Sequence, residues 1–155
     1  MIIRAAVESD LSWLLKIQLE AFSPPWTHGA VLSEIYNDDS FFALACGERG
    51  EFFGFVILRR FIDTGELLQI AVDKNVRRQG VAGRLFDAAL GFAQENELKS
   101  IFLEVRKSNA AAISFYIKYG FLPIRQRKDY YLNPSEDAVE MVLHTDRGRY
   151  GNSGN

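Results

Sequence analysis

The stretch that decides the fold spans residues 67–83, which run Leu67-Leu68-Gln69-Ile70-Ala71-Val72, then four connecting residues, then Arg77-Arg78-Gln79-Gly80-Val81-Ala82-Gly83. The apolar run predicts a buried strand. After the turn, apolar residues recur at helical spacing and predict a helix that ends near Asn96: Val81, Leu85, Ala88, Ala89 and Phe92. A helix start carries unpaired amides and partial positive charge, and small residues there let phosphate oxygens approach. The stretch therefore predicts a pyrophosphate site in the first turn of this helix.

The glycine turn excludes two common nucleotide motifs and matches a third pattern. It lacks both G-x-G-x-x-G and G-x-x-x-x-G-K-[ST]. It matches [QR]-x-x-G-x-[GA], the acetyl-CoA signature of the GNAT N-acetyltransferase superfamily. Two departures are that Ala82 stands where many members have glycine and that residues 77–79 permute the common Q-R-R order. Neither departure prevents phosphate binding, because backbone amides do most of that work.

Later segments resemble the second half of a GNAT domain, in the same order. They are Leu103-Glu104-Val105-Arg106, Ser108-Asn109-Ala110-Ala111-Ala112-Ile113, Phe115-Tyr116 and Tyr119-Gly120-Phe121. With Tyr130-Tyr131 and the earlier Pro24-Pro25-Trp26, the chain is similar to the bacterial ribosomal-protein-alanine N-acetyltransferases over roughly residues 2–144. The resemblance implies acetyl-CoA as cosubstrate, with coenzyme A its sole cofactor. The cofactor-binding residues it implies are Ile70, Ala71, Val72, Arg78, Gln79, Gly80, Val81, Ala82, Gly83 and Asn109.

Acyl transfer to an amine requires a base, an oxyanion donor and an acid for the leaving thiolate. Glu104 is the predicted base, because it is a carboxylate within an apolar strand where desolvation raises a pKa. The resemblance places Tyr116 as the general acid and the Val72 amide as the oxyanion donor. Two alternatives stay open: Glu104 points to solvent or pairs with Arg106, and Tyr116 is an ordinary core aromatic.

Further assignments concern residues around these two catalytic candidates. Asn109 is expected to cap the helix that follows it, besides any role toward the cofactor. Glu66, or a water chain near it, is a reserve base. Trp26, Tyr130 and Tyr131 shape a slot for the acceptor or are simply buried aromatics.

Composition and charge limit the function classes that remain. The formal charge of −2 and a pI near 5.7 argue against general nucleic-acid binding. The acidic loop residues either form a negative rim that attracts a basic peptide or are simply solvated: Glu34, Asp38, Asp39 and Asp63. Cys46, the single cysteine, is expected in the core. His28 and His144 lack partners at ligand spacing, so no metal site is expected. Without a long apolar block, no membrane association is expected, and the location is predicted to be cytoplasmic.

The order of elements predicts a mixed α/β fold with helices on both faces of the sheet. Strands are expected at 2–5, 41–46, 52–60, 66–72, 100–105, 121–127 and 138–144. Helices are expected at 9–21 with Ser9 as cap, from Thr27 to before Asn37, from Val81 to near Asn96, and at 108–119. This β-α-α-β-β-β-α-β-α-β-β order is that of the GNAT fold, which also implies a mostly antiparallel sheet whose strands around 68–72 and 101–105 splay apart. Residues 1–144 are expected to form one domain and 145–155 a flexible tail.

The function predicted is acetyl-CoA-dependent acetylation of a protein N-terminal amine, by direct transfer, with the alanine of a small-subunit ribosomal protein as the leading acceptor. One alternative is a GNAT enzyme that acetylates a small amine or a lysine side chain. A second is a non-catalytic acyl-CoA-binding module, in which Glu104→Gln would cost nothing. The sequence leaves the oligomeric state open.

Overall fold

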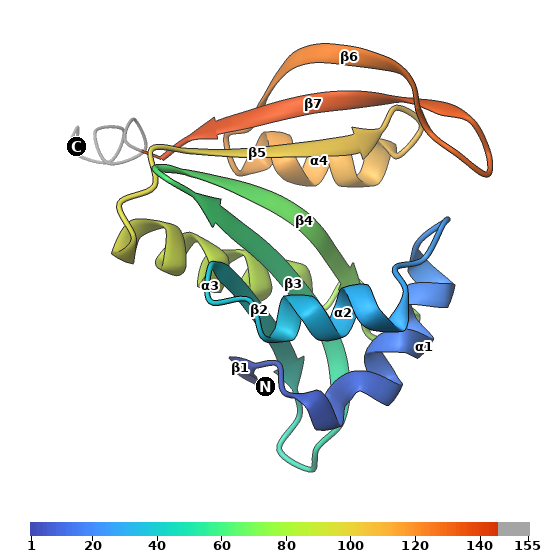
Figure 1. The fold of residues 1–155 in the computed structure, drawn as a ribbon, viewed down its shortest axis with the longest axis vertical. Helices are drawn as coiled ribbons and strands as arrows, with labels where there is room; N and C mark the ends of the chain where they lie inside the picture. The colour runs from blue at the N-terminus through green and yellow to red at the C-terminus, as the bar shows by residue number, and fades with distance from the viewer. Residues whose placement is uncertain (146–155) are drawn as a thin grey trace.

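The computed structural model describes residues 1–145, and the rest of the predicted tail lies outside the described residues. In that part of the chain, seven strands form one sheet in the order β1-β2-β3-β4-β5-β7-β6 (Figure 1). All neighbouring strands are antiparallel except β4 and β5. The strands are β1 (Ile2–Ala5), β2 (Ser40–Cys46), β3 (Phe52–Phe61), β4 (Thr64–Val72), β5 (Ser100–Arg106), β6 (Leu122–Tyr131) and β7 (Glu136–His144).

Helices cover both faces of this sheet, as the sequence predicted. On one face, α1 (Leu11–Ala21) and α2 (His28–Ile35) contribute Leu14, Ile17 and Val31 to a core that includes Cys46. On the other face, α3 (Val81–Glu95) and α4 (Ala110–Lys118) share a second core with the inward side chains of β5. Short 3₁₀ turns, Glu8–Asp10 and Lys74–Val76, precede α1 and α3.

The sequence predicted the N-cap residues of α1 and α2, and one of these two predictions was correct. Thr27 caps α2 as predicted, because its hydroxyl accepts a hydrogen bond from the Ala30 amide at 3.1 Å. The prediction of Ser9 as the cap of α1 was wrong, since a 3₁₀ turn occupies that position and α1 begins at Leu11. Asp10 anchors this end instead: its carboxylate accepts from the Val7 amide at 2.9 Å and pairs with Arg4 of β1 at 2.8 Å. The hydrogen bond from Arg4 lowers the pKa of Asp10.

The feature that creates the site is the early end of pairing between β4 and β5. The two strands are joined in register only from Thr64↔Ser100 to Glu66↔Phe102. Beyond Glu66, β4 continues to pair with β3, and β5 with β7, so the strands diverge (Figure 1). This confirms the splay that the family resemblance implied. The sheet thus opens between its two parallel strands, with unpaired backbone on both edges of the gap.

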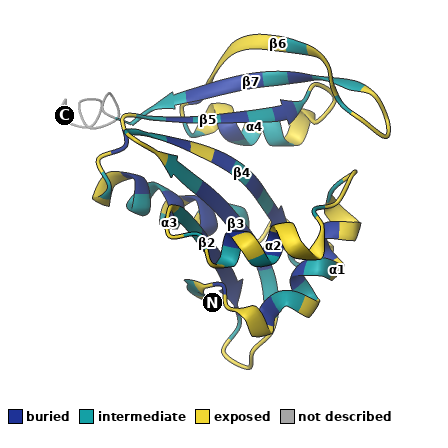
Figure 2. Cartoon of the chain, viewed as in Figure 1, coloured by how far each residue is buried: buried dark blue, intermediate teal, exposed yellow. Residues whose placement is uncertain are grey.

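The last hairpin is longer than the sequence predicted. β6 extends to Tyr131, and β7 begins at Glu136 rather than at 138. Most of β6 is exposed (Figure 2), so it lacks the apolar alternation that identifies a strand. Its register with β7 shifts between Arg127 and Tyr131, where Asp129 adopts a φ of 52°. β7 lies between β5 and β6, so α4 does not connect neighbouring strands.

Candidate active site

A cleft of about 630 Å³ lies where β4 and β5 separate. Its walls come from residues 66–72 of β4, residues 103–106 of β5, α4 with the residue before it, and the loop between α1 and α2. Ala82 of α3 and the end of β6, Tyr130 and Tyr131, complete the lining. Among the predicted site residues, seven line the cleft: Ile70, Ala71, Val72, Ala82, Glu104, Asn109 and Tyr116. The cleft therefore brings together the cradle strand and both predicted catalytic side chains, which are distant in sequence.

The other predicted cofactor residues lie in the turn before α3 or in the first turn of α3, and they do not line the cleft wall: Arg78, Gln79, Gly80, Val81 and Gly83. Gly80 is the N-cap of α3 with a φ of +81°, and no heavy atom lies within 4 Å of the position its Cβ would occupy. The helix hydrogen bonds start with the Arg84 amide, which donates to the Gly80 carbonyl at 3.2 Å. The amides of the preceding first-turn residues are thus left for an external acceptor.

Glu104 faces the cleft because of strand alternation in β5. Its neighbours Leu103 and Val105 belong to the core under α3 and α4, so the Glu104 side chain emerges on the opposite face, where it is 19% exposed. Burial, followed by the nearby carboxylates of Glu66 and Glu140, raises the pKa of Glu104. Its cationic neighbour is Arg127, whose Nε lies 4.0 Å from Glu104 Oε1. The alternative of a pair with Arg106 was wrong, since Arg106 pairs with Glu136.

Tyr116 is both a core residue and a cleft residue. It lies on α4, is 7% exposed, and packs its ring against Phe115 and Phe121. Burial, with a smaller effect from Tyr131, raises its pKa above the ordinary value. The phenol therefore keeps its proton at neutral pH, as a proton donor must.

A carboxylate with a raised pKa, a buried phenol and the first turn of α3, through Ala82, thus meet at one opening in the sheet. The comparisons with known proteins agree, since the acetyltransferase (GNAT) family model matches residues 12–121. The chain belongs to this family. It is an N-acetyltransferase that uses acetyl-CoA as its acetyl donor.

Three relatives of this GNAT enzyme illustrate the likeness. The [ribosomal protein bS18]-alanine N-acetyltransferase of Haemophilus ducreyi is 32% identical over 145 residues, which cover 92% of this chain and 99% of the relative. The crystal structure of the ribosomal-protein-S18-alanine N-acetyltransferase from Escherichia coli superposes with a TM-score of 0.83 at 29% identity, covering 93% of each chain. A Bacillus anthracis acetyltransferase solved with acetyl coenzyme A has a TM-score of 0.64 at 30% identity, covering 72% of this chain and 66% of the other.

The residues of this GNAT enzyme fit acetyl-CoA. A phosphate needs amide donors without a side chain in the way, and the open, left-handed Gly80 and the first turn of α3 provide them. Ala82 in place of glycine lines the cleft without closing it. Asn109 caps α4 as predicted, because its Oδ1 accepts from the Ala112 amide at 3.2 Å.

Aromatic side chains also line the cleft, and behind one of them lie residues that the sequence interpretation missed. Trp26, Tyr130 and Tyr131 all line the cleft, and their role as a slot for the acceptor stays a prediction. Behind Trp26, Gln18 of α1 is fully buried and its Oε1 accepts from the Trp26 amide at 3.0 Å and from Gln69 Nε2 at 3.2 Å. The available signal was Gln69, the one polar residue in the apolar run of residues 67–72. The buried amide pair fixes the loop that carries Trp26.

The predicted acidic rim is not part of the cleft. Glu34 is buried and paired with Arg59, and Asp39 pairs with Arg60. None of Glu34, Asp38, Asp39 and Asp63 lines the cleft. Within residues 1–145, no three His, Cys, Asp or Glu side chains gather in a way that could hold a metal ion. In the same range, no helix has the length and apolar character needed to cross a bilayer.

Proposed function

We propose that this enzyme acetylates the N-terminal amine of a protein, and that the N-terminal alanine of a small-subunit ribosomal protein is its acceptor. The observation that carries the acceptor is the similarity, over 92% of this chain, to a protein named for acetylating the alanine of bS18. The proposed unit is a single domain of residues 1–144. We place the reaction in the cytoplasm, where ribosomal proteins are made.

The cofactor is held by the two edges of the opened sheet. The first-turn amides of α3, with the flexible side chains of Arg78 and Gln79, would bind the pyrophosphate. The backbone of residues 70–72 of β4 would hydrogen-bond the pantetheine arm, since β5 leaves that edge unpaired. Asn109 would contribute from the start of α4. Acetyl-CoA, when bound, supplies an acetyl group activated as a thioester.

Glu104 and Tyr116 would perform the proton transfers. Glu104, with its raised pKa, takes a proton from the acceptor amine, whose nitrogen then forms the bond to the acetyl carbon. The Val72 amide donates a hydrogen bond to the carbonyl oxygen as negative charge develops there. Tyr116 donates its phenolic proton to the sulfur as the C–S bond breaks, so that coenzyme A leaves as a thiol. Glu66 lines the same cleft and remains the reserve base.

The acceptor enters from the side of the cleft that carries the aromatic residues. Trp26, Tyr130 and Tyr131 would contact the first residues of the peptide. The carboxylates of Glu66 and Glu104 make this end favourable for a cationic amine and for basic residues that follow it.

The experiment that tests this function compares acceptors at equal concentration. Turnover of acetyl-CoA is measured with a peptide that begins Ala-Arg, with spermidine, and with a peptide whose only free amine is a lysine side chain. We expect a kcat/KM for the N-terminal amine at least about tenfold above the other two. A preference for spermidine or for the lysine peptide would contradict the proposed acceptor.

A further inference from the structure

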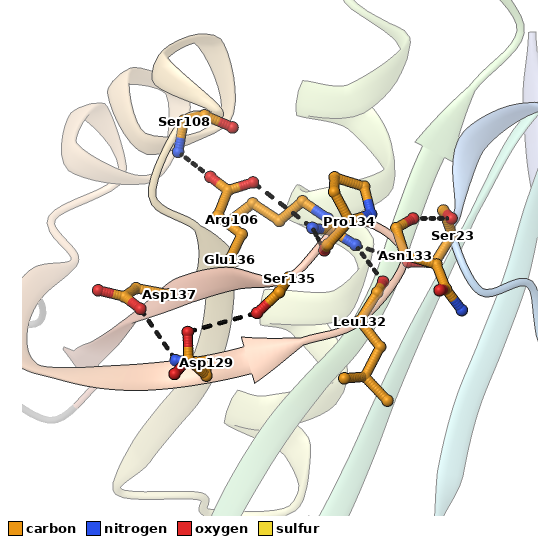
Figure 3. Close-up of polar contacts among 10 residues, drawn as sticks. All are labelled: Ser23, Arg106, Ser108, Asp129, Leu132, Asn133, Pro134, Ser135, Glu136 and Asp137. Carbon is orange, nitrogen blue, oxygen red and sulfur yellow. Dashed lines mark hydrogen bonds and ion pairs between the residues drawn. The ribbon is translucent and has the colours of Figure 1, made fainter.

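Arg106, the last residue of β5, connects two loops that are far apart in the sequence. Its Nη2 donates to the Ser23 carbonyl in the α1–α2 loop at 2.6 Å and to the Leu132 carbonyl in the β6–β7 loop at 3.2 Å. Its Nη1 donates to the Pro134 carbonyl at 3.1 Å and lies 3.4 Å from a carboxylate oxygen of Glu136. Figure 3 shows the guanidinium between the two loops, with Ser23 opposite Asn133. Both terminal nitrogens are thus fully engaged.

Further contacts extend this connection in two directions. The Ser23 hydroxyl donates to the Asn133 carbonyl, so the loops also touch directly. The second carboxylate oxygen of Glu136 accepts from the Ser108 amide at 2.7 Å, just before α4 begins. Hydrogen bonds from Ser108 and Arg106 lower the pKa of Glu136, which keeps it ionised as the partner of Arg106. We call these contacts of Arg106, Ser23, residues 132–134 and Glu136 the Arg106 bridge.

The Arg106 bridge lies at the acceptor end of the cleft. Ser23, Arg106 and Tyr131 all line the cleft. Arg106 also stacks on Tyr131, with its Cζ 4.5 Å from the ring centroid. Because Tyr131 lies next to Tyr130 and close to the Tyr116 phenol, the bridge fixes the aromatic wall on which the acceptor would rest. Without the Arg106 side chain, the hydrogen bond from the Ser23 hydroxyl to the Asn133 carbonyl is what remains between the two loops.

We propose that Arg106 is a positioning residue that holds the α1–α2 and β6–β7 loops together as one wall of the acceptor site, which rests on the proposed function. The side chain acts through the loops and does not touch the reacting atoms. Lysine cannot replace it, because one ammonium group lacks the planar fork that serves three carbonyls and a carboxylate and stacks on an aromatic ring.

The test compares Arg106→Met, Arg106→Lys and Ser23→Ala with the wild-type chain. Arg60→Met is the matched control, since Arg60 is also a partly exposed strand arginine with an ion pair, and it binds Asp39 and the Asn96 side chain at a site outside the cleft. Two quantities are measured: amide hydrogen exchange in residues 22–27 and 132–135, and the separate KM values for an Ala-Arg peptide and for acetyl-CoA.

For Arg106→Met and Arg106→Lys we expect exchange in both loops to accelerate at least about fivefold, because the carbonyls of both loops lose their common donor and the loops then open more often. The peptide KM should rise at least about fivefold, with the acetyl-CoA KM and kcat within about threefold of wild type. Ser23→Ala should change both quantities in the same direction by less, and Arg60→Met should change neither. If Arg106→Met does not fold, Arg106→Lys and Ser23→Ala carry the same test.

Three outcomes would overturn the proposal: unchanged exchange in the two loops, a peptide KM that rises without faster exchange, or faster exchange with an unchanged peptide KM. Wild-type values in Arg106→Lys would also overturn it. A wild-type chain that acetylates no N-terminal peptide would instead refute the proposed function. In that case, the exchange measurement alone decides whether Arg106 holds the loops together.

Discussion

Replacing Gly80 by alanine tests the left-handed turn on which the phosphate site depends. A φ of +81° costs an L-residue about 1–2 kcal/mol relative to its right-handed conformation, and the new Cβ meets no heavy atom within 4 Å. The folded state of Gly80→Ala is therefore destabilised by the unfavourable backbone conformation at residue 80, and not by a clash of the new Cβ with a neighbouring residue. The same turn presents the first amides of α3, so relaxation of the turn should also weaken acetyl-CoA binding severalfold.

Gly91→Ala in the same helix is the matched control. Gly91 has no heavy atom within 4 Å of its Cβ position and lies inside α3, where alanine is about 0.5–1 kcal/mol more favourable than glycine. The two glycine-to-alanine changes should thus move stability in opposite directions and differ by roughly 1.5–3 kcal/mol. For a domain of this size, this corresponds to Tm values about 3–12 °C apart.

Differential scanning calorimetry gives the Tm values, and isothermal titration calorimetry gives the Kd for acetyl-CoA. We expect Gly80→Ala to have a lower Tm and a higher Kd, and Gly91→Ala to have a higher Tm and an unchanged Kd. Equal stabilisation by both substitutions would refute the left-handed turn. A lower Tm in Gly80→Ala with wild-type Kd would instead refute the role of the turn in cofactor binding.

The remaining predictions concern the proton transfers and the cap of α4. Because burial raises the pKa of Glu104, kcat/KM of the wild type should rise with pH as this carboxyl loses its proton, and Glu104→Gln should lose that rise and about 10²–10⁴ in rate. Tyr116→Phe should lower kcat in steady-state turnover assays while the Kd for acetyl-CoA stays unchanged. Asn109→Ala should lose about 0.5–2 kcal/mol of stability and raise the Kd for acetyl-CoA, whereas Thr27→Ala, which removes the cap of α2, should cost stability alone.

For each of these predictions, a specific result would contradict it. If kcat/KM of Glu104→Gln still rises with pH, Glu104 is not the base and Glu66 becomes the candidate. Wild-type turnover by Tyr116→Phe would refute Tyr116 as the general acid. Equal effects of Asn109→Ala and Thr27→Ala on the Kd would reduce Asn109 to a cap. Circular dichroism accompanies each variant, since Glu104 is half-buried and Tyr116 is packed in the core.

Local patterns in the sequence were sufficient to locate most helices and strands. The apolar spacing after Gly80 identified α3, and Thr27 marked the start of α2, because both signals act within one turn of helix. Ser9 failed as a cap because Asp10 forms an ion pair with Arg4 of a different element, a contact that no local pattern encodes. The end of β6 was missed for a related reason, since an edge strand that faces water carries no apolar alternation.

The site was predictable in its chemistry but not in its geometry. Glu104 stood out as a carboxylate between apolar residues, and the structure places it in the cleft with a raised pKa. The separation of β4 from β5 depends on where pairing stops, and residues 66–72 carry no signal for it beyond the family resemblance. The sequence suggested only a local partner, Glu104, for Arg106. The carbonyls that accept its hydrogen bonds belong to loops 26 to 83 residues away, which no local pattern indicates.

The most direct test of the account is coenzyme A release from acetyl-CoA with a peptide that begins Ala-Arg, measured beside the same peptide with a blocked N-terminus. The account predicts release with the free amine, none with the blocked peptide, and an added acetyl group on the N-terminal alanine by mass spectrometry. Equal release with both peptides, or none with either while acetyl-CoA binds, would contradict it.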